Sequence, residues 1–184
     1  MAKLVMMGNR NGSYTNVDAV ENVIKYITRT RAYETREDEL ICYGGAGIGA
    51  YLPPYDIIRQ FLYVQELYNI KSRKGRRIYH ETLTFTDEEF RSLNGDYKEI
   101  ISIAERISHL HFASGHQVLY GIHLSKEKKL HIHFAINTIN FITGLKWHSY
   151  KGDLQERECI YNDIIKQHYY IYIRKMVKPV DNYI

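Results

Sequence analysis

GIHLSKEKKLHIHFAIN, residues 121–137, has the pattern of two β-strands joined by a polar turn. Side chains alternate between the two faces of a strand. His131 and His133 therefore share one face of the second strand, together with Ala135 and Asn137. The residues between them are apolar and point the other way, toward the expected core: Ile132, Phe134 and Ile136. The stretch predicts a hairpin with one apolar face and one histidine face.

Closing this hairpin about Glu127 pairs His123 with His131. Residues directly opposed on antiparallel strands point to the same face, with Cβ atoms roughly 4.5–5.5 Å apart. His133 lies one pleat further along. Three imidazoles then converge on a patch small enough for one metal ion, and a three-histidine site leaves coordination positions for water or substrate. The alternative is a polar strand face in contact with solvent.

The rest of the chain alternates helical and strand patterns, without internal repeats. Apolar spacing predicts helices over 16–31, 54–70, 87–111 (with an interruption near Gly95) and 153–176. Strands are predicted over 39–43, 78–86, 117–124 and 130–139, with a flexible glycine-rich loop over 44–49. Because several strands are adjacent in sequence, we predict an α+β fold, in which a central antiparallel sheet is covered by helices.

Length, charge and cysteine content narrow the class of protein. A chain of 184 residues fits a single domain, 1–184. Its formal net charge of +4 permits a polyanionic partner without requiring one. Only two cysteines occur, Cys42 and Cys159, far apart in sequence and without a C-x-x-C motif. This argues against a disulfide framework or a cysteine zinc site and favours a reducing compartment. The sequence predicts no membrane segment and no secretion signal, so we expect a cytoplasmic protein.

Five short motifs occur together along the chain. They are KYITR at 25–29, LICYGG at 40–45, YHETLTF at 79–85, HIHFAIN at 131–137 with a histidine eight residues before its first histidine, and NFITG at 140–144. In this combination they resemble the conjugative relaxases, which are mobilisation nucleases of the histidine–hydrophobic–histidine (HUH) superfamily. The first motif looks like the nucleophile motif of MobP and MobQ relaxases, and HIHFAIN is similar to the metal motif of the family. The resemblance covers roughly residues 15–150.

The resemblance implies a metal-dependent enzyme of plasmid or mobile-element mobilisation. Such an enzyme nicks and rejoins DNA in a site- and strand-specific way at an origin of transfer, through a 5′-phosphotyrosyl intermediate. Tyr26 would be the nucleophile, and His123, His131 and His133 would hold one divalent ion. The family favours Mg²⁺ or Mn²⁺, whereas histidine ligands alone suit Mn²⁺, Zn²⁺, Ni²⁺ or Co²⁺ better than Mg²⁺. The chain would be an HUH-relaxase-like single nickase domain, either a minimal relaxase or a part of a larger one.

Tyr26 also has a purely structural interpretation. On a helical wheel it lies about 60° from Val23, beside the apolar stripe, as a packing residue would. Tyr14 and Tyr33 are the nearest competitors in sequence for the role of nucleophile. A tyrosine phenol is a weak nucleophile, with an ordinary pKa of ~10, and needs a neighbouring cation, base or metal to lose its proton.

Binding of DNA requires basic and aromatic groups. We predict DNA contacts from Arg29, Arg31, Arg73, Lys74, Arg76, Arg77, His80 and Thr84. The residues from 71 to 77 form the densest positive run, for which a solvated loop is the alternative. The partner implied by the resemblance is single-stranded DNA at an origin of transfer, with or without an adjacent hairpin. Accessory DNA-binding and coupling proteins are further implied partners.

The expected metal site lacks an obvious carboxylate to orient one of its histidines. Relaxases often carry acidic residues in the turn before the histidine pair, but here the turn is rich in lysine and Glu127 is its only acid. Glu81 is a second option. Strand alternation, however, places Glu81 on the face of Leu83 and Phe85. The opposite face, a possible site face, carries His80, Thr82 and Thr84.

Other functions are compatible with parts of this pattern. A rolling-circle replication initiator or a single-tyrosine transposase is a close relative, although these enzymes usually place the tyrosine after the histidine pair. A non-catalytic single-stranded DNA-binding module would bind DNA in a salt-dependent way without a covalent adduct. An unrelated three-histidine metalloenzyme acting on a small molecule would retain metal without binding DNA.

Overall fold

The structure, a computed structural model, describes residues 1–8, 14–31, 38–69, 74–93, 96–127, 129–150 and 152–176. Within them lies an antiparallel five-stranded sheet with strand order β1-β3-β5-β4-β2. The strands are β1 (Lys3–Met6), β2 (Asp38–Ala46), β3 (Ile78–Thr84), β4 (Val118–Ser125) and β5 (Leu130–Asn137). The helices are α1 (Ala19–Ile27), α2 (Pro54–Leu67), α3 (Asp87–Ser92), α4 (Tyr97–Ala113) and α5 (Asp153–Met176). The predicted α+β class is confirmed.

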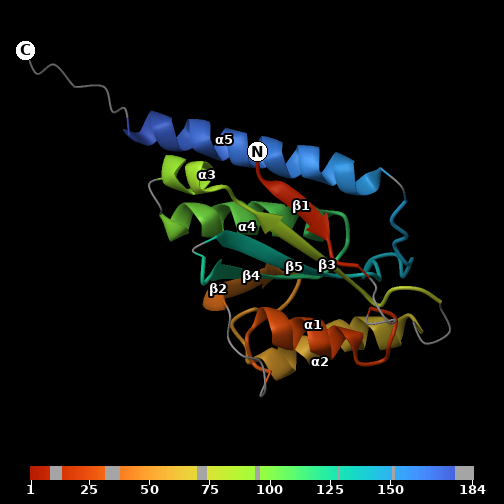
Figure 1. Cartoon of the computed structure of the whole chain (residues 1–184). Coiled ribbons are helices and arrows are strands. Elements are labelled where there is room, and N and C mark those ends of the chain that lie inside the picture. The colour runs from red at the N-terminus through yellow and green to blue at the C-terminus, as the bar shows by residue number, and fades with distance from the viewer. Residues whose placement is uncertain are drawn as a thin grey trace, which may run out of the picture.

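Helices cover both faces of the sheet, with α1 and α2 on one side and α4 and α5 on the other (Figure 1). The alternation predicted for the hairpin separates two cores. Ile122, Ile132 and Phe134 are buried in the core shared with α4 and α5. Leu119 and Ala135 are buried in the core shared with α1 and α2. The histidine face of the hairpin is therefore the face that α1 covers.

The register of the hairpin agrees with the prediction. β4 and β5 pair His123 with His131, and Gly121 with His133. This pairing follows from closing a polar turn between two strands whose apolar residues must share one face, because a slip of one residue would turn every side chain to the wrong face. Among the described residues, no helix has the length and apolarity needed to cross a bilayer.

Two sequence-based boundaries are wrong. The flexible loop predicted from residue 44 begins later, because Gly44 and Gly45 continue β2. A Cβ on Gly44 would overlap the Tyr120 hydroxyl on β4, so glycine lets the two strands pass closely. The helix predicted over 16–31 ends at Ile27, where the backbone of Arg29 turns left-handed with φ 54°.

The helix predicted over 87–111 with an interruption near Gly95 is divided there into α3 and α4. Thr86 caps α3 through a reciprocal capping box with Glu89, and Asp96 then caps the separate start of α4. The prediction also lacked β1, a strand of four residues that pairs with β3 at the sheet edge. Its alternation is too short to stand out in the sequence.

Candidate active site

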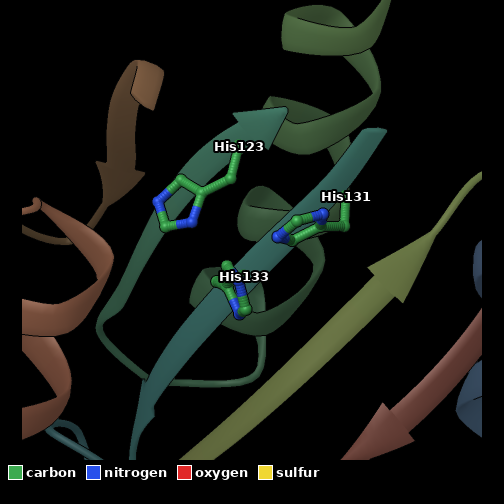
Figure 2. A group of neighbouring side chains, drawn as sticks. All are labelled: His123, His131 and His133. Atoms are coloured by element: carbon green, nitrogen blue, oxygen red, sulfur yellow. The ribbon is translucent and has the colours of Figure 1, made fainter. Parts of the chain in front are cut away.

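Three histidines from two neighbouring strands meet on the sheet face beneath α1. His123 comes from β4, and His131 and His133 come from β5, with their rings close together (Figure 2). Their ring centres lie 4.6 to 5.6 Å apart. One ring nitrogen from each residue lies within 4.8 Å of the others. The hairpin register alone produces this convergence, since positions 123 and 131 are directly opposed.

Backbone carbonyls fix the proton positions on two of these rings. The Nε2 of His123 lies 2.7 Å from the carbonyl oxygen of Ile27, at the end of α1. The Nδ1 of His131 lies 3.2 Å from the carbonyl oxygen of Lys129. A carbonyl oxygen only accepts, so each of these nitrogens carries the proton in the neutral ring and the other nitrogen carries the lone pair. On His123 that lone pair, on Nδ1, accepts from Arg29 Nη2 at 2.9 Å.

His133 has partners on one ring nitrogen only. Its Nδ1 lies 3.0 Å from His80 Nε2 and 3.0 Å from Thr82 Oγ1. Its Nε2 is buried and has no hydrogen-bond partner. Burial, reinforced by the positive charge that His80, His123 and the other neighbours would carry, holds the pKa of His133 well below its ordinary value. The ring is therefore neutral, and Nε2 is a buried lone pair or a buried unsatisfied donor.

His80 lies inside the protein, behind His133. Its Nδ1 is 3.1 Å from the hydroxyl of Tyr14, and only 4% of the residue is exposed. Burial, with His123, Arg31 and Arg76 nearby, lowers the pKa of His80 to about 3. Strand alternation put His80 on the face opposite Glu81, and the contact with His133 shows that this is the face of the histidine cluster.

Tyr26 is the described tyrosine whose ring meets the histidines most directly. The centre of its half-buried ring lies 5.2 Å from that of His133, 5.6 Å from that of His80 and 6.2 Å from that of His123. The guanidinium carbons of Arg29 and Arg31 lie 4.7 and 5.9 Å from the centre of the Tyr26 ring. Tyr26 thus stands between imidazoles and two fixed positive charges. Tyr33 lies outside the described residues.

Gly121 makes this meeting of helix and sheet possible, and the sequence prediction did not include it. A Cβ at this position would lie 2.6 Å from Ile27 Cγ2 and 2.9 Å from the Ile27 carbonyl oxygen. Any larger residue would push the end of α1 away from β4. The available signal was a glycine inside a strand, two residues before His123 and on the same face.

The predicted DNA-contacting residues differ in how the structure holds them. Arg76 lies over the ring of Tyr14 at 4.9 Å and donates to the carbonyl of Met7. Arg77 donates to the carbonyl of Thr15. Thr84 is directly opposite His131 in the sheet register, and Lys74 is exposed. Arg73 lies outside the described residues.

Glu81 is on the opposite face of the sheet, as strand alternation predicted. Its carboxylate is fully buried, pairs with Arg157 Nη2 at 2.7 Å and accepts from the Tyr161 hydroxyl at 3.1 Å. Both partners belong to α5. Glu81 therefore does not orient a histidine of the site.

Comparison with known proteins identifies the chain. The sequence pattern of MobA/VirD2-like relaxases, in their nuclease domain, matches residues 26–170. The chain belongs to this family. It is a DNA relaxase, and the matched residues include Tyr26 and all three clustered histidines.

A solved relaxase has a similar fold to this one. That protein is the conjugative relaxase TrwC, in a metal-bound complex with oriT DNA. The two chains are 14% identical and superpose with a TM-score of 0.53, over 96% of this relaxase and 70% of the TrwC chain. At this identity the likeness establishes the fold. No curated protein matches the chain.

The histidine cluster of this relaxase fits a divalent metal ion. Three imidazoles present ligand nitrogens within 4.8 Å of one another, and the Nε2 of His133 is buried without a hydrogen-bond partner. An ion would use that lone pair, and at His123 it would take over the lone pair that Arg29 occupies. An all-nitrogen set suits a first-row transition metal better than Mg²⁺, which prefers oxygen ligands.

Proposed function

We propose that this relaxase nicks and rejoins one DNA strand at an origin of transfer, with Tyr26 as the nucleophile. One divalent ion would be held by His123, His131 and His133. The position of Tyr26 carries the proposal: its ring lies 5.2 Å from the His133 ring and 4.7 Å from the Arg29 guanidinium. Groups that favour or accommodate negative charge thus surround the one phenol that the family motif singles out.

Activation of Tyr26 follows from its neighbours. The positive charges of Arg29 and Arg31 favour the phenolate over the phenol at the distances given above. Both residues are half-buried, so solvent screens their charges less than it would on an open surface. The same two residues are suited to neutralise the non-bridging oxygens of a phosphodiester placed over Tyr26.

The proposed step exchanges one ester for another. The Tyr26 Oη would form a bond to phosphorus while the bond from phosphorus to the 3′ oxygen breaks. The 3′ oxygen leaves with a proton as a free hydroxyl, and the protein stays joined to the 5′ phosphate. Because a phosphodiester is kept throughout, attack by the 3′-hydroxyl reverses the step. When bound, the ion supplies positive charge beside the phosphate oxygens.

The DNA would reach this site along the basic residues near Tyr14 and Tyr26. We propose backbone phosphate contacts from Arg29, Arg31, Lys74, Arg76, Arg77 and Thr84, with Arg73 retained from the sequence alone. His80, which was predicted from the sequence to contact DNA, is too deeply buried for a direct phosphate contact. Accessory proteins, an adjacent DNA hairpin and a cytoplasmic location stay expectations.

The test uses single-stranded DNA that carries the origin of transfer of the relaxase's own mobile element, with Mn²⁺ present. With the label at the 3′ end, wild-type protein should carry the label as a covalent adduct on a denaturing gel. With the label at the 5′ end, the product should be a shorter free fragment ending in a 3′-hydroxyl. EDTA should suppress both products.

Tyr26→Phe should lower adduct formation at least about 1,000-fold, because the attacking oxygen is missing. Its DNA affinity and free energy of unfolding should match those of the wild type. Tyr63→Phe, at an exposed position on α2, is the matched control and should react normally. An adduct that persists in Tyr26→Phe would contradict the assignment. Salt-dependent DNA binding by wild-type protein without any adduct would instead favour a non-catalytic binding module.

A further inference from the structure

We infer that His80, and not a carboxylate, is the positioning residue that holds His133 in the orientation and tautomer needed for a metal ligand. The inference rests on the proposed metal site. Ligating histidines normally donate their second N–H to an outer partner, commonly a carboxylate or a carbonyl. Glu81, the acid nearest in sequence, is engaged on the far face of the sheet with Arg157 and Tyr161.

The geometry around His133 supplies another partner. Among the described residues, the side chains that bond its ring are His80 and Thr82, both from β3 and both at Nδ1. His80 Nε2 lies 3.0 Å from His133 Nδ1, and His80 Nδ1 lies 3.1 Å from the Tyr14 hydroxyl. Three side chains thus form a buried line from Tyr14 through His80 to His133.

One assignment of protons gives the N–H of His133 an acceptor, and it leaves the lone pair on the partnerless Nε2. If the proton were on Nε2, a buried N–H would have no acceptor, which costs about 1–3 kcal/mol. With the proton on Nδ1, His133 donates to His80 Nε2, and His80 Nδ1 donates to the Tyr14 oxygen. The His133 lone pair then sits on Nε2, the ring nitrogen that no other group bonds.

Thr82 is the weaker of the two candidate partners. Its hydroxyl rotates about a single bond and both donates and accepts, so it does not select a tautomer. The His80 ring is held in place by Tyr14 on one side and by burial on the others. Thr82 therefore supplies a comparison variant.

A neutral outer partner has a chemical consequence. A carboxylate in this place would donate negative charge toward the ion and strengthen its binding. An imidazole fixes the ring without adding charge. The ion would therefore keep more of its positive charge for the phosphate oxygens, and the protein would bind the ion less tightly than with a carboxylate partner.

Two substitutions of His80 test the roles of its two ring nitrogens separately. The amide of glutamine reaches about as far as Nε2 does, so His80→Gln keeps an acceptor for His133. The amide of asparagine reaches only as far as Nδ1, so His80→Asn keeps the partner of Tyr14 and removes that of His133. Titration calorimetry with Mn²⁺ should give a Kd about 10–100-fold higher for His80→Asn. His80→Gln and Thr82→Val should stay within about threefold of the wild type.

A second measurement follows the tautomer directly and needs no metal. The imidazole ¹⁵N chemical shifts of metal-free wild-type protein should identify His133 as protonated on Nδ1. In His80→Asn the Nδ1-protonated form of His133 should no longer be the main tautomer, while in His80→Gln it should remain so. His109→Asn, at an exposed site on α4, is the control for both measurements.

The inference is overturned if wild-type His133 is protonated on Nε2, or if His80→Asn binds Mn²⁺ as tightly as the wild type. It is also overturned if His80→Gln loses as much affinity as His80→Asn, because a packing role alone would then explain both losses. Wild-type protein that takes up no Mn²⁺ would contradict the proposed metal site, while the tautomer of His133 would still decide the role of His80.

Discussion

At the scale of single residues, Arg29 has a strained backbone, and its side chain contacts both Tyr26 and His123. Its φ of 54° is in the left-handed region, which costs a non-glycine residue roughly 1–2 kcal/mol. This turn ends α1 and brings the guanidinium back over Tyr26 and against His123. Strain retained at such a place is characteristic of functional sites.

Arg29→Gly should therefore separate stability from activity. Glycine adopts this backbone freely, so the free energy of unfolding in denaturant should stay level or rise by up to about 1 kcal/mol. Adduct formation should fall about 10-fold or more, because a charge beside the reacting phenol is lost. A variant that keeps wild-type adduct formation would remove Arg29 from the site, and a large loss of stability would contradict the argument from strain.

At the scale of elements, the site depends on how closely α1 lies on β4. The Ile27 carbonyl reaches His123 because Gly121 has no side chain to hold the helix away. Tyr26 precedes Ile27 in the same helix, so the spacing that sets this hydrogen bond also sets the distance from Tyr26 to the histidines. A helix terminus and a glycine in a strand thus position the proposed nucleophile together.

Gly121→Ala should disturb this contact without altering any functional side chain. The added methyl group would press on Ile27, and such overpacking costs about 1–3 kcal/mol of unfolding free energy. Adduct formation should fall by about 10-fold or more because Tyr26 is displaced. Gly8→Ala is the control, since nothing lies within 4 Å of a Cβ at that position. Equal stability and activity in the two variants would show that the close approach is unimportant.

At the scale of the whole molecule, a second buried polar network lies across the sheet from the site. His111 at the end of α4 bonds the Tyr161 hydroxyl, and Tyr161 in turn bonds Glu81. Arg157 and His116 also face His111, and burial is the main cause that lowers its pKa to about 3. This network fastens α5 and α4 to β3, the strand that carries His80 on its other face.

His111 should make stability depend on pH. In the unfolded chain its pKa is ~6.5, so below that pH the unfolded state binds a proton that the folded state takes up only near pH 3. The free energy of unfolding should therefore fall by about 1.4 kcal/mol per pH unit as pH drops from 6.5 toward 3, with no contribution above 6.5. In denaturant titrations, His111→Gln should lower this slope by that amount and His109→Gln should not. An unchanged slope in His111→Gln would contradict the assignment.

The sequence alone determined the hairpin and therefore the histidine cluster. The two-residue period of a strand, with the polar turn about Glu127, fixes which side chains share a face and which are opposed. It also placed His80 and Glu81 on opposite faces of their strand. These are local consequences of backbone geometry, so they can be read without knowing the rest of the fold.

Only the tertiary structure decided what lies against that cluster. The contact of Ile27 with His123 and the line from Tyr14 through His80 to His133 join residues 53 to 96 positions apart. The turn of Arg29 over Tyr26 depends on the same packing. Periodicity within an element carries no information about which helix end meets which strand residue. That choice is made by the packing of both cores against the sheet, where a single glycine, Gly121, sets the distance.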